Sequence, residues 1–276
     1  MNIGALREQI TRDFTAGDKP ILVAGTAGTV STGAVDPLPE IAALCREFDL
    51  WFHVDGAYGA LAAIVPDVPP ALRGLCEADS VAVDPHKWLY APLEAGCALV
   101  RNANRLRGAF SYHPAYYHFG DAAINYFDFG PQNSRGFRAL KVWLALQQCG
   151  SDGYVQMISD DMRLSRAMYE QIAGFPELEP LSQGLSITTF RYVPQNLNRD
   201  VNTNTYLDEL NRELLTRLQN SGEVYLSNAL VHGKFALRAC IVNFRTSLED
   251  VEELLPIVVR IGREVDADLR TQKSSS

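Results

Sequence analysis

The sequence lacks the features that mark several protein classes. Its five cysteines are scattered and form no Cys-x-x-Cys pair, so neither a zinc cluster nor a disulfide framework is indicated. We expect them to be small apolar side chains in a reducing compartment. No run approaches the roughly 20 apolar residues needed to cross a bilayer, and residues 1–14 form an amphipathic helix pattern without a signal-peptide core. We therefore expect a soluble, cytoplasmic protein with no membrane partner.

Positive charge is also scarce. Lys and Arg number 25 against 33 Asp and Glu, which gives 276 residues a formal net charge of −8. This balance argues against a general nucleic-acid binder, but it allows one small anion in a local basic pocket. Hydrophobic residues make up 47% and charged residues 21%, as in ordinary globular proteins, and the length suits one large or two ordinary domains.

The first hundred residues alternate short apolar runs with stretches of helical period. The pattern predicts strands at 21–25, 50–54, 80–83 and 98–100, with helix-rich connections at 37–48, 57–64 and 70–76. Crossovers of this length imply parallel strands with helices covering the sheet. Ligands bind beyond the carboxyl ends of such strands, so the loops after Val54 and Val83 are the first candidates for a site.

The second half of the sequence predicts a different architecture. Residues 110–132 form a long irregular segment crowded with aromatics, and such segments are usually functional or mobile. Helices are predicted at 136–148, onward to 168, at 206–218 and at 248–269, with strands near 185–192 and 235–242. We place a boundary near Gly150, with a large domain over 1–150, an α+β domain over 151–270 and a disordered tail over 271–276.

Two charged side chains follow neighbouring strands of the predicted sheet. Asp55 stands in HVDGAYG after one strand, and Lys87 stands in DPHKW after another. If both strands belong to one sheet, the two side chains project from the same edge, and a partly desolvated lysine there is a usable amine nucleophile. A pyridoxal phosphate site requires such a lysine for its Schiff base and an acid that keeps the pyridine nitrogen protonated. From spacing alone, a surface or ion-paired Asp and Lys is the commoner outcome.

Three successive motifs resemble one family. AGTAGTVSTGAVDP, HVDGAYG and DSVAVDPHKW, in this order and spacing, are similar to the group II pyridoxal-phosphate-dependent amino acid decarboxylases, which include aromatic-L-amino-acid, histidine, tyrosine and glutamate decarboxylases. FRALKVWLAL and LRACIVNFRT resemble downstream segments of that family, so the likeness runs from near residue 1 to about residue 265. It implies an α/β chain of fold type I, with part of a large, mostly parallel sheet domain and a C-terminal α+β domain. It also implies pyridoxal phosphate as cofactor and a homodimer.

The resemblance implies roles for residues in the two loops. Lys87 would be the Schiff-base lysine, Asp55 would be the partner of the pyridinium nitrogen, and Ala57 would pack its methyl against one face of the ring. His86 would count among the catalytic residues and lie near the phosphate, where a donor imidazole favours the anion. Asp84 would lie there too, where it repels phosphate unless it instead orients His86.

Two further residues are carried over from the family with alternatives beside them. Thr26 would hydrogen-bond near the cofactor or Asp55, and a turn hydroxyl bonded to its own backbone is an equal alternative. In HPAY, which resembles the family's mobile catalytic loop, Tyr116 would deliver a proton to the substrate carbon after carbon dioxide leaves. A phenylalanine there would favour the oxidative deamination of related aldehyde synthases. An ordinary loop aromatic is the alternative, and Tyr117 is the neighbouring register. No histidine pair has metal-ligand spacing, so no metal is predicted.

The chain departs from the family at its start. A complete member has upstream segments that carry a small-residue loop for the phosphate and a histidine that stacks on the ring, whereas AGTAG matches neither G-x-G-x-x-G nor a Walker loop. The chain resembles the carboxyl part of a decarboxylase, as a fragment, a truncated gene model or half of a split enzyme. We predict a carboxy-lyase that converts an L-amino acid to the amine and carbon dioxide, with weak cofactor binding by the isolated chain. The alternatives are an aldehyde synthase or aminotransferase, and a partial chain acting only as a dimer partner.

Overall fold

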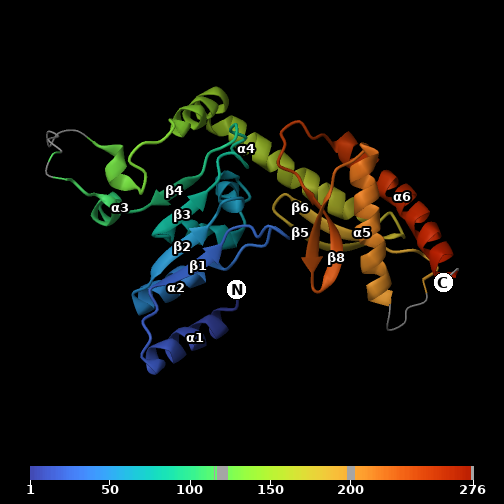
Figure 1. Ribbon diagram of the computed structural model, residues 1–276, viewed down its shortest axis with the longest axis horizontal. Helices are drawn as coiled ribbons and strands as arrows, with labels where there is room; N and C mark the ends of the chain where they lie inside the picture. The colour runs from blue at the N-terminus through green and yellow to red at the C-terminus, as the bar shows by residue number, and fades with distance from the viewer. Residues whose placement is uncertain (115, 117–123, 198–202, 275–276) are drawn as a thin grey trace.

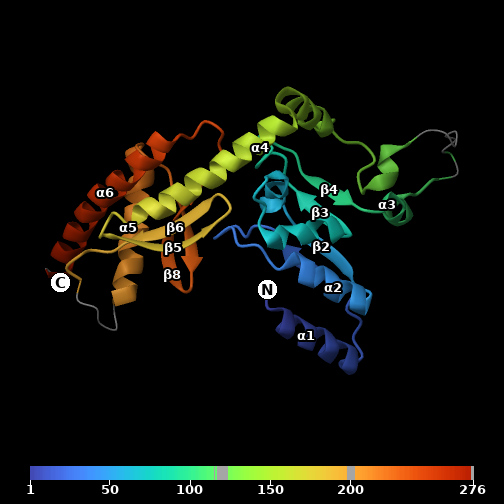
Figure 2. The same cartoon turned by 180° about the vertical axis from the view of Figure 1, so that it is seen from behind.

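The computed structural model describes residues 1–114, 116, 124–197 and 203–274. In this part of the chain, two lobes each contain a four-stranded sheet. The long helix α4 (Arg138–Ile172) runs from one lobe to the other (Figure 1). Figure 2 shows from behind that α4 remains the bridge between the lobes. Helices α1 (Ile3–Ala16) and α2 (Leu38–Phe48) lie on one side of it, and α5 (Thr203–Ser221) and α6 (Leu248–Ser274) on the other.

The first lobe is built on strands in the order β1-β2-β3-β4. These are β1 (Leu22–Thr26), β2 (Trp51–Asp55), β3 (Ser80–Val83) and β4 (Cys97–Val100). The first three strands are parallel, as the crossovers predict, but β4 pairs antiparallel with β3. The prediction of parallel pairing is wrong for β4 because the chain between these strands turns back as a loop without a crossover helix, which leaves only the antiparallel direction.

One face of this sheet is packed against α2 (Leu38–Phe48). The core under it contains buried side chains from β1 and β2, Val23, Phe52 and Val54, together with Leu38 and Ile41 from the helix. The remaining helices of the lobe are α1 (Ile3–Ala16), η1 (Gly59–Ile64), η2 (Pro70–Glu77), α3 (Ala103–Phe110) and η3 (Tyr126–Phe129). The predicted strands and the predicted helix-rich connections therefore occur where the periodicity indicates.

The second lobe is an antiparallel sheet covered by helices. Its strands are β5 (Leu178–Gly184), β6 (Ile187–Tyr192), β7 (Ser227–Val231) and β8 (Lys234–Cys240), in the order β5-β6-β8-β7. Helices α5 (Thr203–Ser221) and α6 (Leu248–Ser274) pack with the end of α4 around a core that includes Phe190, Leu214, Leu237 and Val258. No helix in the described part of the chain combines the length and apolarity that crossing a bilayer needs.

The predicted domain boundary near Gly150 stays a prediction, and packing contacts cross this position. Gly150, with φ 65° and ψ 176°, breaks the helical backbone inside α4. Beyond it, Ile158 still packs into the core of the first lobe, together with Leu185 and Ile187. The predicted disordered tail is wrong for residues 271–274, because α6 extends to Ser274 and Thr271 Oγ1 donates to the Ala267 carbonyl at 2.9 Å. Residues 275–276 lie outside the described part.

Candidate active site

The loops that carry Asp55 and Lys87 lie at the same edge of the first sheet. Strands β2 and β3 are parallel neighbours in which Asp55 is the register partner of Ala82. The Asp84 N–H donates to the Ala57 carbonyl at 3.1 Å and so joins the loop after β2 to the loop after β3. The two strands therefore belong to one sheet, which is the condition that the sequence analysis set. Asp55 and Lys87 follow them at the carboxyl edge of this sheet.

Lys87 is accessible and paired within its own loop. Its side chain is 40% exposed, and Nζ lies 2.8 Å from Asp84 Oδ2. Pro85 in the same turn is buried, and Asp84, His86 and Lys87 are each partly exposed, so this amine is only partly removed from solvent. Asp84 is the partner of Lys87 and not of His86, so the alternative in which Asp84 orients the imidazole does not describe this arrangement.

The backbone determines the orientation of His86. Its Nδ1 lies 2.8 Å from the Ala95 carbonyl oxygen. Because a carbonyl only accepts, Nδ1 carries the hydrogen, and the neutral ring presents Nε2 as an acceptor. His86 can therefore donate a hydrogen bond from Nε2 to an anion only when its ring is protonated. The predicted role near a phosphate then requires the charged imidazolium.

Asp55, Ala57 and Thr26 lie together at the ends of β1 and β2. The exposed Asp55 accepts the Ala57 N–H at 3.2 Å through Oδ1. Thr26 is the register partner of Asp55 on the neighbouring strand, and its own N–H donates to Asp36 Oδ2 at 2.9 Å. Among the described residues, no hydrogen bond is formed by the Thr26 hydroxyl, so its predicted contact and its alternative both stay predictions.

The aromatic segment after α3 contains an unexpected contact between His113 and a buried carboxylate. Asp128 is 2% exposed, and its Oδ1 lies 2.7 Å from His113 Nε2 and accepts Ser111 Oγ at 3.1 Å. Burial raises the pKa of Asp128, but the hydrogen bonds from His113 and Ser111 outweigh burial and bring that pKa below its ordinary value. The sequence showed no sign of this pair, since the two residues stand among many other loop residues.

Tyr116 is among the described residues of that segment, whereas residues 115 and 117–123 lie outside them. Its ring is 74% exposed, as is the ring of Tyr126, which stands just before the buried Asp128. Tyr117, the alternative register of the predicted proton donor, lies outside the described residues. The assignment of Tyr116 therefore stays a prediction.

Two aromatic residues inside the quoted motifs were not predicted to matter. Tyr58 and Trp88 stack with ring centroids 4.8 Å apart and planes at 19°, and so pack the two site loops against each other. The Tyr58 hydroxyl lies 2.6 Å from Ser186 Oγ and accepts the Ser186 N–H at 3.0 Å. The sequence signal was their position, three residues after Asp55 and one after Lys87.

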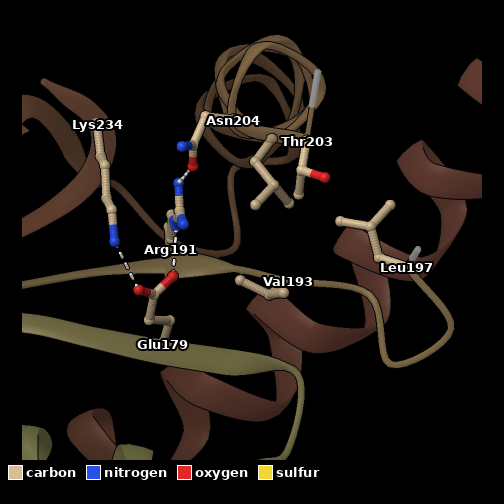
Figure 3. Close-up of a pocket in the computed structure, with 8 residues that line it drawn as sticks. Glu179, Arg191, Val193, Leu197, Thr203, Asn204 and Lys234 are labelled. Carbon is tan, nitrogen blue, oxygen red and sulfur yellow. Dashed lines mark hydrogen bonds and ion pairs between the residues drawn. The ribbon is translucent and has the colours of Figure 1, made fainter. Parts of the chain in front are cut away.

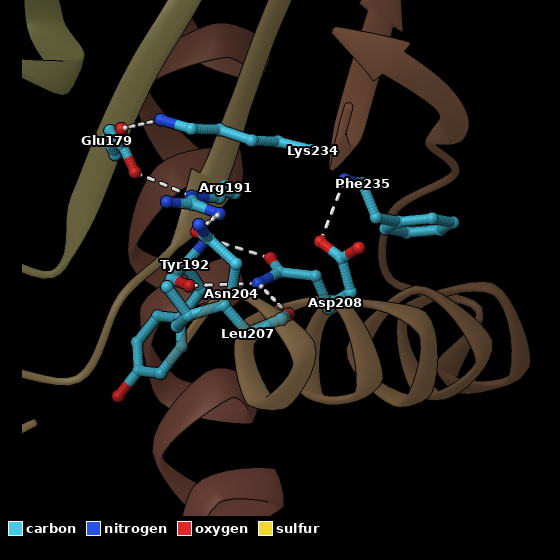
Figure 4. Close-up of polar contacts among 9 residues, drawn as sticks. Glu179, Arg191, Tyr192, Asn204, Leu207, Asp208, Lys234 and Phe235 are labelled. Atoms are coloured by element: carbon cyan, nitrogen blue, oxygen red, sulfur yellow. Dashed lines mark hydrogen bonds and ion pairs between the residues drawn. The ribbon is translucent and has the colours of Figure 1, made fainter. Parts of the chain in front are cut away.

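A separate cavity of about 290 Å³ lies in the second lobe and contains none of the predicted site residues (Figure 3). Arg191, 5% exposed, donates to Glu179 at 2.5 Å, and Lys234 donates to the same carboxylate at 2.9 Å (Figure 4). Arg191 also donates to Asn204 at the start of α5 at 3.3 Å. Burial raises the pKa of Glu179, but the two cations outweigh burial and lower it. The charged side chains of Glu179, Arg191 and Lys234 in this cavity are therefore paired with one another.

Comparison with known families decides what the first site belongs to. Residues 1–192 match the model of the pyridoxal-dependent decarboxylase conserved domain. The chain belongs to this family. The resemblance carried by the three motifs is confirmed, and pyridoxal phosphate, the cofactor expected from them, is the cofactor on which the family depends.

Individual relatives and solved structures agree with the family. The chain is 35% identical to the aromatic-L-amino-acid decarboxylase of Bacillus atrophaeus, across 96% of this chain and 55% of that protein. It is 31% identical to tyrosine decarboxylase 2 of Arabidopsis thaliana, across 92% of this chain and 47% of that protein. The structure of Oryza sativa TDC with PLP and tryptamine superimposes with a TM-score of 0.87 at 28% identity, covering 96% of this chain and 55% of that one. The predicted α/β fold of type I is therefore confirmed, and the chain spans about half the length of the relatives it matches.

Proposed function

We propose that this chain carries the lysine and the pyridine-nitrogen partner of a pyridoxal-phosphate-dependent carboxy-lyase that converts an L-amino acid to its amine and carbon dioxide. The observation that carries the proposal is the placement of Asp55 and Lys87 at one carboxyl edge of neighbouring parallel strands, in a chain of the decarboxylase family. Ligands of such sheets bind beyond this edge. The relatives with aromatic substrates support an aromatic amino acid as substrate.

The residues present suit the cofactor. Lys87 offers a 40% exposed amine, Asp55 an exposed carboxylate, and Ala57 a side chain small enough to leave room for a ring. Bound pyridoxal phosphate would supply an electron sink for the pair left behind when the substrate carboxylate departs. The 2.8 Å contact with Asp84 Oδ2 holds Lys87 Nζ in place at this edge of the sheet. Asp55 would hold a proton on the ring nitrogen, and a protonated His86 would offer its Nε2–H to the phosphate.

The proposal is tested by trapping the cofactor on its lysine. The purified chain is incubated with pyridoxal phosphate, reduced with borohydride and digested, and the modified peptide is identified by mass spectrometry. We expect modification of Lys87 well above that of Lys19, an exposed lysine outside the site, and equal release of amine and carbon dioxide from an aromatic amino acid. Lys87→Ala should abolish release while Lys19→Ala leaves it unchanged. Release that survives Lys87→Ala would overturn the proposal.

Tyr116 is proposed as the group that returns a proton to the substrate carbon. Tyr116→Phe should then lower amine release and raise aldehyde release, because a proton donor is lost while the ring is kept. Tyr126→Phe is the matched comparison, since both tyrosines are 74% exposed in the same segment. If Tyr126→Phe, and not Tyr116→Phe, shifts the product, the assignment to Tyr116 is wrong and Tyr126 takes the role.

An aldehyde synthase is the second candidate. It is favoured by 31% identity to the 4-hydroxyphenylacetaldehyde synthase of Rhodiola rosea, across 94% of this chain and 52% of that protein. The two candidates differ in products, since an aldehyde synthase consumes dioxygen and releases aldehyde and ammonia, whereas the carboxy-lyase releases the amine. Product analysis with and without dioxygen separates them.

Cofactor affinity and assembly belong to the same proposal. We expect weak binding of pyridoxal phosphate by this chain alone and a homodimer in the cytoplasm. Exposed apolar side chains support the homodimer, because a second copy of the chain could cover them. Phe137, Trp143 and Leu99 are 75%, 55% and 56% exposed. Size-exclusion chromatography with light scattering tests the dimer, and a monomer at micromolar concentration would contradict it.

A further inference from the structure

A buried carboxylate on α4 contacts the loop that carries Lys87. Asp161 is 1% exposed, and its Oδ2 accepts hydrogen bonds from Trp88 Nε1 at 2.8 Å and from the Tyr90 hydroxyl at 2.7 Å. These donors stand one and three residues after Lys87. One oxygen atom of a distant helix therefore holds two side chains of this loop.

The same face of α4 holds the loop backbone between those two side chains. Tyr154, two helical turns before Asp161, donates its hydroxyl to the Leu89 carbonyl at 3.0 Å. Three consecutive residues, 88 to 90, are therefore each bonded to α4. In contrast, the Lys87 side chain is 40% exposed, and the contact it makes among the described residues is with Asp84 of its own loop.

The bonded residues are connected to Lys87 and to the loop of Asp55. The Tyr90 N–H donates to the Lys87 carbonyl at 3.2 Å, so a shift of Tyr90 moves the backbone of Lys87. Trp88 is fully buried and stacks on Tyr58, which follows Asp55 by three residues. The position of the indole therefore affects both loops of the proposed site.

We propose that Asp161 is a positioning residue for Lys87, acting through Trp88 and Tyr90 to hold the amine at the edge of the sheet that also carries Asp55. The inference rests on the proposed function of Lys87. An apolar residue at position 161 would fill the same space in the core, but it would leave the indole N–H and the phenol without an acceptor in a buried place. The loop would then move to reach water, and Lys87 would move with it.

The test uses the full chain and variants that separate hydrogen bonding from packing. Asp161→Leu removes the acceptor at similar volume, and Asp161→Asn keeps one acceptor oxygen without the charge. Trp88→Phe removes the N–H donor together with part of the buried ring system, but it keeps a ring on Tyr58, so it carries the test if Asp161→Leu does not fold. Asp160→Asn, the exposed neighbour that bonds Gln156 and Arg163, is the matched control.

Two measurements are made on each variant. Hydrogen–deuterium exchange of residues 84–91 reports the loop in the absence of any cofactor. Trapping with pyridoxal phosphate and borohydride reports the labelling rate of Lys87 relative to Lys19 in the same sample. We expect faster exchange and about tenfold slower relative labelling of Lys87 in Asp161→Leu, the lower end of what losing a supporting contact costs a site. Trp88→Phe should change both in the same direction, whereas Asp161→Asn and Asp160→Asn should stay near wild type.

The outcomes distinguish this inference from the proposed function. If Lys87 of the wild type is labelled no faster than Lys19, the proposed function is overturned, and the inference falls with it. If Lys87 is labelled preferentially and equally in wild type, Asp161→Leu and Trp88→Phe, only the positioning role of Asp161 is overturned. The positioning role is supported if the relative labelling of Lys87 falls in Asp161→Leu but stays near wild type in Asp161→Asn. General damage to the core would not depend on an acceptor oxygen.

Discussion

The hydroxyl of Tyr58 joins the two lobes beside the loop of Asp55, and its removal has a calculable cost. It accepts the Ser186 N–H at 3.0 Å and lies 2.6 Å from Ser186 Oγ, and Ser186 is fully buried. Tyr58→Phe keeps the ring on Trp88 but leaves a buried main-chain donor without a partner, which costs about 1–3 kcal/mol. Loss of the hydroxyl pair adds about 1 kcal/mol. We therefore expect the free energy of unfolding to fall by about 2–4 kcal/mol.

Urea denaturation followed by circular dichroism and tryptophan fluorescence measures this loss. Tyr225→Phe is the control, because Tyr225 is 80% exposed and its change should stay within about 0.5 kcal/mol. Ser186→Ala should cost only about 1 kcal/mol, since the Tyr58 oxygen still accepts the remaining N–H. The double variant should cost less than the sum of the two single variants, because both remove the same hydroxyl pair.

The relative costs of Tyr58→Phe and Ser186→Ala can refute the reasoning. If Tyr58→Phe costs less than about 1 kcal/mol, or less than Ser186→Ala, the Ser186 N–H is not dependent on the phenol. Burial raises the pKa of Tyr58 above its ordinary value, so the hydroxyl stays protonated through the neutral range. The loss should therefore be the same across neutral pH, and a loss that varies there would point to another group.

Three further predictions concern the rest of the fold. Asn211→Ala should cost about 2–4 kcal/mol in urea denaturation, because the fully buried Asn211 bonds both the N–H and the carbonyl of Tyr192, at 2.8 and 2.9 Å. Gly33→Ala should lower the melting temperature, since φ is +70° and an added Cβ would lie 2.1 Å from the Gly184 carbonyl oxygen; Gly17→Ala, also at positive φ but in open space, is the comparison that isolates the clash. The lowered pKa of Glu179 means that its contribution is present above about pH 4.3 and is lost as pH falls through the folded value, so the stability gap between wild type and Glu179→Gln should shrink on acidification.

The first lobe was readable from the sequence because its signals are local. Apolar runs of four or five residues followed by helical periods predicted β1, β2 and β3 and their parallel order, and the edge of the sheet followed from that order. The predicted direction of β4 was wrong, because a run of apolar residues does not indicate whether a strand pairs parallel or antiparallel with its neighbour. The loop after Lys87 reverses the chain before β4, and residues 88–90 of this loop are hydrogen-bonded to the distant helix α4.

The second lobe was less readable because its edge strands carry weak patterns. β5 (LEPLSQG) contains a proline and a glycine and does not alternate apolar with polar residues, and β7 (SNALV) is short, so neither showed a strand period. Residues 271–274 lacked an apolar stripe, yet they continue α6 because a helix already formed propagates at little cost.

In the site, sequence spacing indicated which residues share an edge but not what they touch. Asp55 and Lys87 could be placed from two strands, since each stands directly after one. The ion pair of Lys87 with Asp84 and the bonds of Asp161 depend on side-chain geometry, and Asp161 stands more than seventy residues from its partners. An aspartate inside a helix usually faces solvent, and the burial of Asp161 distinguishes it from its neighbour Asp160.

The two faces of the first sheet explain why the site is only partly formed by the described residues. On one face Phe52 and Val54 are buried, whereas on the other Leu22 is 48% exposed and Asp55 is exposed. The apolar residues of β1 and β2 alternate onto both faces, which is the pattern of a parallel sheet covered on both sides. Asp55 belongs to the face without cover, so a ring held there would lie against solvent. The amine of Lys87, 40% exposed at the same carboxyl edge, is likewise only partly covered by the described residues.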